Sequence, residues 1–177
     1  MTAIPLNPIT LRYNGLFDFD GMYAAIIDWA KNYGYLWFER SYKHKVPGPQ
    51  GAELEFEWVM TKNITEYINY DILIIVHTWD TKEVEVEVDG KKKKLTQSRL
   101  YLIFQGTLEI DWQKRFDKGG KMAKLLGKWT EKVKTPELEG VYADQLYYRL
   151  WNLHALLKKF FDLQSKKHVY KGYLGEG

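Results

Sequence analysis

Glutamate alternating with large apolar residues is the feature that most constrains how this chain folds. In three segments an acidic residue stands at nearly every second position: 53–58, 83–88 and 108–112. Successive side chains of a strand point to opposite faces, so each segment has one acidic, solvated face and one apolar face. Segments of this kind predict an antiparallel sheet with a single buried face.

Seven segments are predicted to form strands. The first is Ile9–Tyr13, and the other six follow one another: 35–46, 52–60, a strand within 66–80, 84–88, 95–105 and 108–112. The run 47–51 is rich in proline and glycine, and Asp89-Gly90 is a strong two-residue hairpin signal. Consecutive strands joined by short turns predict that most of the sheet is a meander.

Apolar residues at helical spacing predict three helices. The first covers 18–33, where Asp18 or Asp20 can cap the start and Gly34 suits a left-handed C-terminal cap. The second is a basic segment at 118–134, and the third runs roughly from Tyr142 to Leu163. Their apolar stripes require a partner, which the apolar face of the sheet supplies. The predicted fold is α+β: a curved antiparallel sheet of about seven strands, packed on one face by an N-terminal helix and two C-terminal helices.

A single domain is predicted for residues 1–177, because this length buries a sufficient core without disulfides or metals. Residues 9–116 are expected to be mainly sheet, 117–164 helical and 165–177 a flexible tail. The chain has no cysteine, and Met1–Pro5 lacks the basic and apolar regions of a signal peptide. No apolar stretch is long enough to cross a bilayer. These features predict a cytoplasmic location.

No motif for catalysis, metal binding or nucleotide binding is present. The four histidines are scattered without metal-ligand spacing: His44, His77, His154 and His168. Neither GxGxxG after a strand nor GxxxxGK[ST] occurs. We therefore expect no cofactor and no metal, and no residue is assigned a catalytic role.

The order of the predicted elements resembles the START-like helix-grip superfamily, which includes lipid-transfer domains, polyketide cyclases and the major birch-pollen allergen. The resemblance covers Ile9 to Leu163 and departs from the pattern in two places, the single helix at 18–33 and the extra basic helix. It implies a cavity between the sheet and the last helix that takes an apolar small molecule or lipid, and it leaves a cyclase-type activity open. The residues expected to line such a cavity are Phe56, Trp58, Trp79, Leu150 and Phe160.

Charge is distributed unevenly, with a net charge of −4 in residues 1–111 and +7 in residues 112–177, for a total of +3. Cations in and beside the predicted helix 118–134 form a candidate surface for an anionic partner: Lys114, Arg115, Lys118, Lys121, Lys124, Lys128 and Lys132. Such a helix can contact nucleic acid, an anionic membrane or an acidic protein, or it can pack on the core with a solvated lysine face. Lysine greatly outnumbers arginine, which argues against base-specific nucleic-acid recognition.

The stretch Ile72–Val76 is apolar on both of its predicted faces, unlike the other strands. Ordinary burial, contact with another subunit or the wall of a cavity would each explain it. Three functions follow. The favoured one is a non-catalytic binding or scaffold protein that acts through protein–protein surfaces, possibly by self-association. The others are a helix-grip carrier of an apolar ligand, and a binder of nucleic acid or anionic membranes through helix 118–134.

Overall fold

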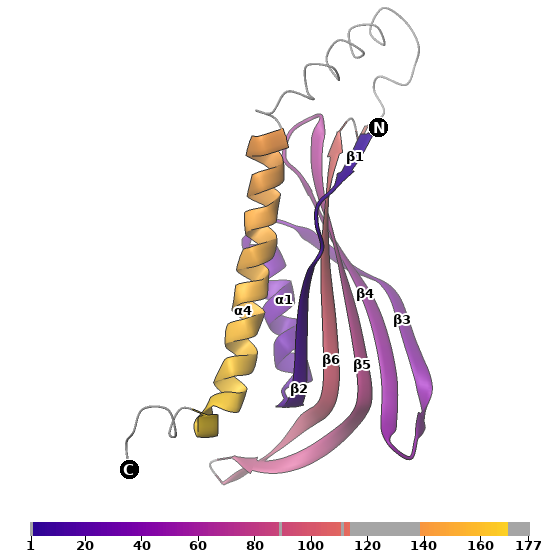
Figure 1. Ribbon diagram of the computed structural model, residues 1–177, viewed down its shortest axis with the longest axis vertical. Helices are drawn as coiled ribbons and strands as arrows, with labels where there is room; N and C mark the ends of the chain where they lie inside the picture. The colour runs from indigo at the N-terminus through magenta and orange to yellow at the C-terminus, as the bar shows by residue number, and fades with distance from the viewer. Residues whose placement is uncertain (1, 89, 111, 114–138, 170–177) are drawn as a thin grey trace, which may run out of the picture.

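The computed structural model describes residues 2–88, 90–110, 112–113 and 139–169. In chain order the elements are β1 (Thr2–Pro5), β2 (Ile9–Phe17), α1 (Phe19–Asn32), β3 (Leu36–Gly48), β4 (Gly51–Asn63), β5 (Ile68–Val88), β6 (Lys91–Ile110), a short π-helix η1 (Glu139–Ala143) and α4 (Asp144–Val169). The described part is therefore α+β, with one open antiparallel sheet of six strands and two α-helices (Figure 1).

The sheet has the order β1–β6–β5–β4–β3, and β2 also pairs with β6. Strands β3 to β6 are neighbours in sequence and in space, which is the predicted meander. β1 pairs with residues 107–110 of β6 and β2 with residues 96–104, so the two form one interrupted edge strand. Pro8 lies in the interruption, where its missing N–H removes no ladder hydrogen bond.

The prediction of about seven strands differs from the six observed in the described residues. Segments 66–80 and 84–88 belong to one strand, β5, because a bulge between Trp79 and Lys82 bends the chain without ending the pairing. Segments 95–105 and 108–112 likewise belong to one strand, β6, which ends at Ile110. β1 was not predicted, because Pro5 at its end and Pro8 just after it obscure so short an edge strand.

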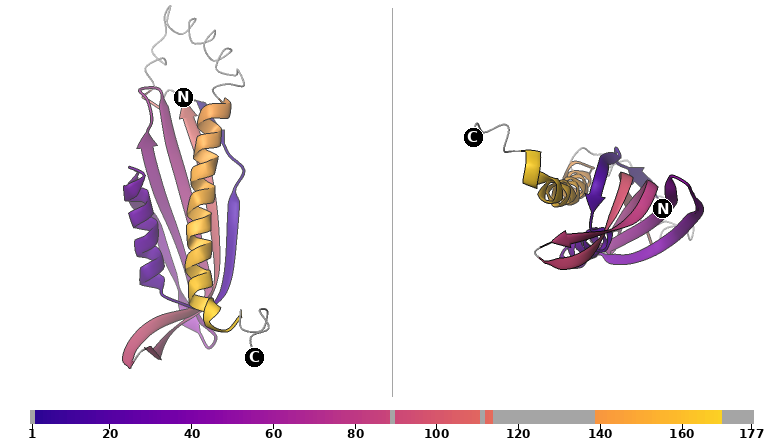
Figure 2. Two further views of the ribbon diagram at one scale, coloured as in Figure 1. Left: turned by 90° about the vertical axis from the view of Figure 1, so that its left-hand side faces the viewer. Right: turned by 90° about the horizontal axis from the view of Figure 1, so that it is seen from below.

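Both helices pack on one face of the sheet, here called the inner face (Figure 2). α4 lays a stripe of leucines on it, all without exposed surface: Leu146, Leu150, Leu153 and Leu157. These leucines pack on buried apolar side chains from the three central strands of the inner face: Phe56, Trp58, Met60, Ile72, Ile74, Val76, Leu100, Leu102 and Phe104. α1 joins the same core and is tied to α4 by Trp29, whose Nε1 donates to Asn152 Oδ1 at 2.8 Å.

Gly106 allows α4 to pack closely on the sheet, and it does not bend β6. It pairs in register with Ile72, so the strand runs on without interruption. A Cβ built on it would lie 2.8 Å from Leu150 Cδ1 and 3.3 Å from Leu146 Cγ. Because both leucines are fully buried, the missing side chain sets how closely the helix approaches.

The helix ends agree with the predicted signals for α1 and differ for α4. α1 begins after Asp18, whose Oδ1 accepts from Gly21 N at 2.9 Å, and Gly34 follows it with φ 72°. α4 continues to Val169, so the first residues of the predicted tail 165–177 are helical. The predicted helix 118–134 and residues 170–177 lie outside the described residues. Within the described chain, neither helix has the length and apolar character that crossing a membrane requires.

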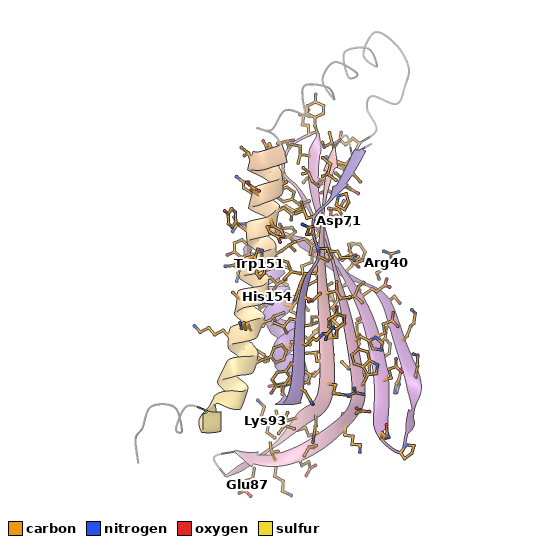
Figure 3. The ribbon with its side chains drawn as sticks, viewed as in Figure 1. Arg40, Asp71, Glu87, Lys93, Trp151 and His154 are labelled. Carbon is orange, nitrogen blue, oxygen red and sulfur yellow. The ribbon has the colours of Figure 1, made fainter. Side chains whose placement is uncertain are left out.

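β5 and β6 continue beyond the rest of the sheet as a two-stranded arm (Figure 3). β4 pairs with β5 as far as Thr81, and past that point β5 has only β6 as a neighbour. On the arm, Lys93 Nζ lies 2.8 Å from Asp18 Oδ2. Asp18 therefore caps α1 with one oxygen and fastens the arm to the helix start with the other.

Replacing Gly106 with alanine tests the close approach of α4. The added methyl must displace Leu150 in a filled core, and overpacking of this kind costs about 1–3 kcal/mol. We expect Gly106→Ala to lower the free energy of unfolding by that amount in urea denaturation followed by circular dichroism. Gly48→Ala is the matched control, because no atom lies within 4 Å of its added Cβ. Equal stability of the two variants would contradict the packing described.

The pH dependence of Asp18 gives a second test. Lys93 is the main cause that lowers the pKa of Asp18, so its charge stabilises the fold at neutral pH and the stabilisation is lost as the pH falls below 3.8. Asp18→Asn keeps the cap and should cost less than about 1 kcal/mol at pH 7, since Lys93 is half exposed. Asp18→Ala loses the cap as well and should cost about 1 kcal/mol more. Urea unfolding from pH 7 to 3 should show wild type and Asp18→Asn converging. A difference in the free energy of unfolding that is as large at pH 3 as at pH 7 would contradict this role of the charge.

Candidate binding site

The outer face of the sheet, opposite α1 and α4, changes in character along the strands. At one end lie polar and acidic groups, including Asp71 and Glu109. The middle is apolar, with half-buried or buried side chains from four strands: Val59, Leu73, Ile75, Ile103 and the exposed Phe38. The other end carries arginine and aromatic side chains. The strand Ile72–Val76 is thus apolar on both faces, and its outer side belongs to this apolar middle.

The glutamates of β4 do face outward, as the alternation predicts, but they do not form a free acidic surface. Each lies near a cation of the edge strand β3: Glu57 with Arg40 at 3.6 Å, Glu55 with Lys43 at 3.2 Å and Glu53 with Lys45 at 2.7 Å. The cations are about 60% exposed, so solvent screens each pair and its contribution to the stability of the fold is small. The main effect of these pairs is to neutralise the negative charge of the β4 glutamates, not to stabilise the fold.

A pocket of about 560 Å³ opens between β2, β6 and β5 at the arginine-rich end. Its lining residues are Arg12, Tyr13, Asn14, Trp79, Arg99, Leu100 and Tyr101. The strand register places each arginine directly opposite an aromatic residue, Arg12 beside Tyr101 and Arg99 beside Trp79. The guanidinium carbons lie 5.0 Å and 5.8 Å from the respective ring centroids. Two arginine–aromatic pairs in adjacent rows therefore define the pocket.

Neighbouring side chains hold these pairs in place. The His77 ring stacks on Trp79 with a centroid separation of 3.9 Å, and its Nε2 lies 2.7 Å from Glu53 Oε1. Lys45 and His77 both bond to Glu53 and lower the pKa of that carboxyl. Arg99 Nε donates to Asp80 Oδ2 at 2.6 Å, which leaves the terminal nitrogens of its guanidinium as donors.

Arg12 is the cation best placed to meet a ligand. It is exposed, and no described carboxylate lies within ion-pair distance of it. The Tyr101 ring beneath it restricts the guanidinium, which reduces the entropy lost when that group bonds to an anion. Planar guanidinium groups bind phosphate and carboxylate through paired N–H donors and also stack on flat rings. The pocket thus offers donors for an anion and surfaces for a planar ring.

Electrostatics favour this end of the outer face over the other. Burial raises the pKa of Asp71, the nearby Glu109 raises it further, and Arg40 opposes the rise. The carboxyl groups of Asp71 and Glu109 therefore make the far end unfavourable for an anion. In Figure 3, Asp71 and Arg40 lie in the sheet away from α4, which carries His154 and Trp151.

Of the five residues expected to line an apolar cavity, four lie in or against one core and the fifth lies on the other face of the sheet. Phe56, Trp58 and Leu150 are buried in the core on the inner face, and Phe160 is partly buried against the same core. Trp79 lies on the outer face, in the pocket with Arg99. The seven cations expected to form an anion-binding surface, Lys114, Arg115, Lys118, Lys121, Lys124, Lys128 and Lys132, fall outside the described residues. That surface stays a prediction.

Sequence reasoning missed most of this pocket. It named His77 among the scattered histidines and Trp79 among the cavity residues, but it did not consider Arg12, Arg99 and Tyr101. Their signal was present, since arginine and tyrosine stand at outward positions of strands that are otherwise apolar. Their proximity depends on β2 pairing with β6, which sets Arg12 opposite Tyr101, a residue far away in the sequence, and no local pattern specifies that pairing.

No protein-family model matches this chain, and no curated protein is significantly similar to it. In the described residues, no three histidine, aspartate or glutamate side chains gather in a metal-binding arrangement. The geometry of the outer face is therefore the main indication of what the protein binds.

Arg12→Ala should leave the fold intact, which separates binding from stability. The side chain is exposed and makes no ion pair with a described residue, so we expect the free energy of unfolding to change by less than about 0.5 kcal/mol. Thermal and urea unfolding followed by circular dichroism measure this change. A loss above 1 kcal/mol would mean that the contact with Tyr101 is a structural one.

Proposed function

We propose that this protein is a non-catalytic binding protein whose outer sheet face takes an anionic ligand with a planar ring. The single observation that supports this most is the pocket of about 560 Å³ in which Arg12 and Arg99 each lie over an aromatic ring. A volume of this order suits a ligand the size of a nucleotide. Guanidinium groups supply the anion contacts, and the ring contacts supply orientation.

The location of the pocket also supports binding without covalent chemistry. It lies on a sheet surface, so its groups are fixed by strand register and by the stacked His77. A nucleophile activated by an adjacent base is missing from the described lining. Rigid strands with restrained arginines are suited to recognition, because little order has to be created on binding.

A second candidate, self-association, is favoured by the apolar middle of the outer face. Leu36 is 72% exposed and Phe38 48% exposed on the edge strand β3, close to the apolar side chains of β4 and β5. Apolar side chains that gather on one face commonly mark an interface. Light scattering after size-exclusion chromatography distinguishes this candidate: a dimer that Phe38→Ser converts to a monomer supports it, and a wild-type monomer at high concentration rejects it.

Titration with adenosine 5′-monophosphate tests the proposed ligand class. Isothermal titration calorimetry should detect binding, with adenosine and inorganic phosphate alone each binding more weakly. Arg12→Ala and Arg99→Ala should each weaken binding about tenfold or more, since a hydrogen bond to a charged group contributes about 1.5–3 kcal/mol.

Lys31→Ala serves as the control, because Lys31 is an exposed cation on α1, on the other side of the sheet. Its affinity should equal that of the wild type. If Lys31→Ala and Arg12→Ala reduce the affinity equally, the nucleotide binds by nonspecific charge attraction. If the wild-type protein binds neither the nucleotide nor benzoate or another ring-bearing anion, the proposal is overturned.

A further inference from the structure

The arginine–aromatic pocket is the middle part of a longer track that starts at α4, passes round the edge strand β2 and continues over the outer face. A second pocket, of about 260 Å³, lies between β2 and α4 and shares Arg12 and Tyr13 with the first. A third, of about 540 Å³, lies beside the β3–β4 turn and shares Trp79 and Arg99 with the first. The three pockets therefore adjoin one another, from Lys158 on α4 to Lys45 on β3.

The length of this track exceeds that of a single small ligand. It crosses β2, β6, β5 and β4 and reaches β3, which is four strand spacings, or about 19 Å. Its cations are distributed along the path rather than directed at one point. In order they are Lys158, Arg12, Arg99 and Lys45.

Charge along the track is positive in its first half and balanced in its second. Neither Lys158 nor Arg12 has a carboxylate of the described residues within ion-pair distance. Arg99 is paired with Asp80, and Lys45 shares Glu53 with His77. A polyanion would thus first meet two cations, on α4 and β2, that have no carboxylate partner among the described residues, and then the paired cations Arg99 and Lys45.

Aromatic groups are interleaved with these cations. Tyr101 lies under Arg12 and Trp79 under Arg99, and both rings are half-buried. Phe161, next to Lys158, is buried against Tyr13 and therefore forms the floor of its pocket rather than a stacking surface. A row of rings between cations is the arrangement by which proteins bind single-stranded nucleic acid, with phosphates on the cations and unstacked bases on the rings and guanidinium planes. A duplex keeps its bases stacked and cannot use the rings.

We propose that single-stranded nucleic acid binds along this track, from α4 round the edge strand β2 and over the outer face, with about four nucleotides in contact. The inference depends on the proposed function, whose pocket is the central binding position. Recognition uses ring faces and the backbone, so it needs no fixed base sequence. It differs from binding through residues 118–134, because every group invoked lies on β2–β6 or α4.

The test is fluorescence anisotropy of the full-length protein with fluorescein-labelled oligo-dT and oligo-U of two, four, eight and twelve nucleotides. Affinity should rise at least tenfold from two to eight nucleotides. For the octamer, the logarithm of the binding constant should fall with the logarithm of salt concentration with a slope of about −2 to −3, which corresponds to three or four phosphates. A duplex of the same length should bind at least tenfold more weakly.

Variants assign the binding to the track. Lys158→Ala and Arg12→Ala should each reduce the salt slope by about 0.7. Tyr101→Leu should weaken octamer binding about tenfold with an unchanged slope, since it removes a ring and no charge. Tyr101→Phe keeps the ring and should bind the octamer as tightly as the wild type does. Lys31→Ala should also have the affinity of the wild type. Circular dichroism verifies that each variant is folded.

The outcomes separate the two proposals. If adenosine 5′-monophosphate binds through Arg12 and oligonucleotides bind no tighter than the dinucleotide, the track is rejected and the proposed function stands. If neither nucleotide nor oligonucleotide binds, both fail. If oligonucleotides bind tightly but Arg12→Ala, Lys158→Ala and Tyr101→Leu leave the affinity unchanged, the nucleic acid occupies another surface and this inference is overturned.

Discussion

The packing of α4 against β6 is the interaction on which the rest of the structure depends. Four leucines of the helix are fully buried, and Gly106 of the strand has no side chain at the point of closest approach. Burial of each leucine contributes roughly 1.5–3 kcal/mol. Because α1 packs on the same side, this contact buries one face of the sheet in the core. The other face has no helix of the described residues over it, and its properties depend on its own side chains.

The outer face is therefore the part of the molecule where surface chemistry is concentrated. Its acidic residues on β4 are balanced by cations on β3, its middle is apolar, and one end gathers arginine and aromatic side chains. A stable core allows such a surface, because none of these side chains is needed to fill the interior. Arg12 and Arg99 are exposed residues on strands that the inner face already anchors.

Strand continuity gives the outer face its shape. β5 and β6 run through the bulge at Asp80 and form the arm, so the position of Trp79 and Arg99 is set just before the strands bend. Asp80 adopts φ 56° there and also accepts from Arg99. Bulges redirect side chains near functional surfaces. Here the bulge and the arginine contact coincide at one residue, which couples the bend of the arm to the arrangement of the pocket.

Local patterns in the sequence were enough to predict the α+β class, the meander, the capped helix α1 and the leucine stripe of α4, because each depends on hydrophobic periodicity or on a turn. They did not determine that 66–80 and 84–88 form one strand, since a bulge and a strand end look alike in an alternation pattern. Which side chains meet on the outer face depends instead on tertiary structure. Cross-strand register sets Arg12 opposite Tyr101 and Arg99 opposite Trp79, on the face of the sheet away from Phe56. Register is a relation between segments far apart in the chain, and no local pattern encodes it.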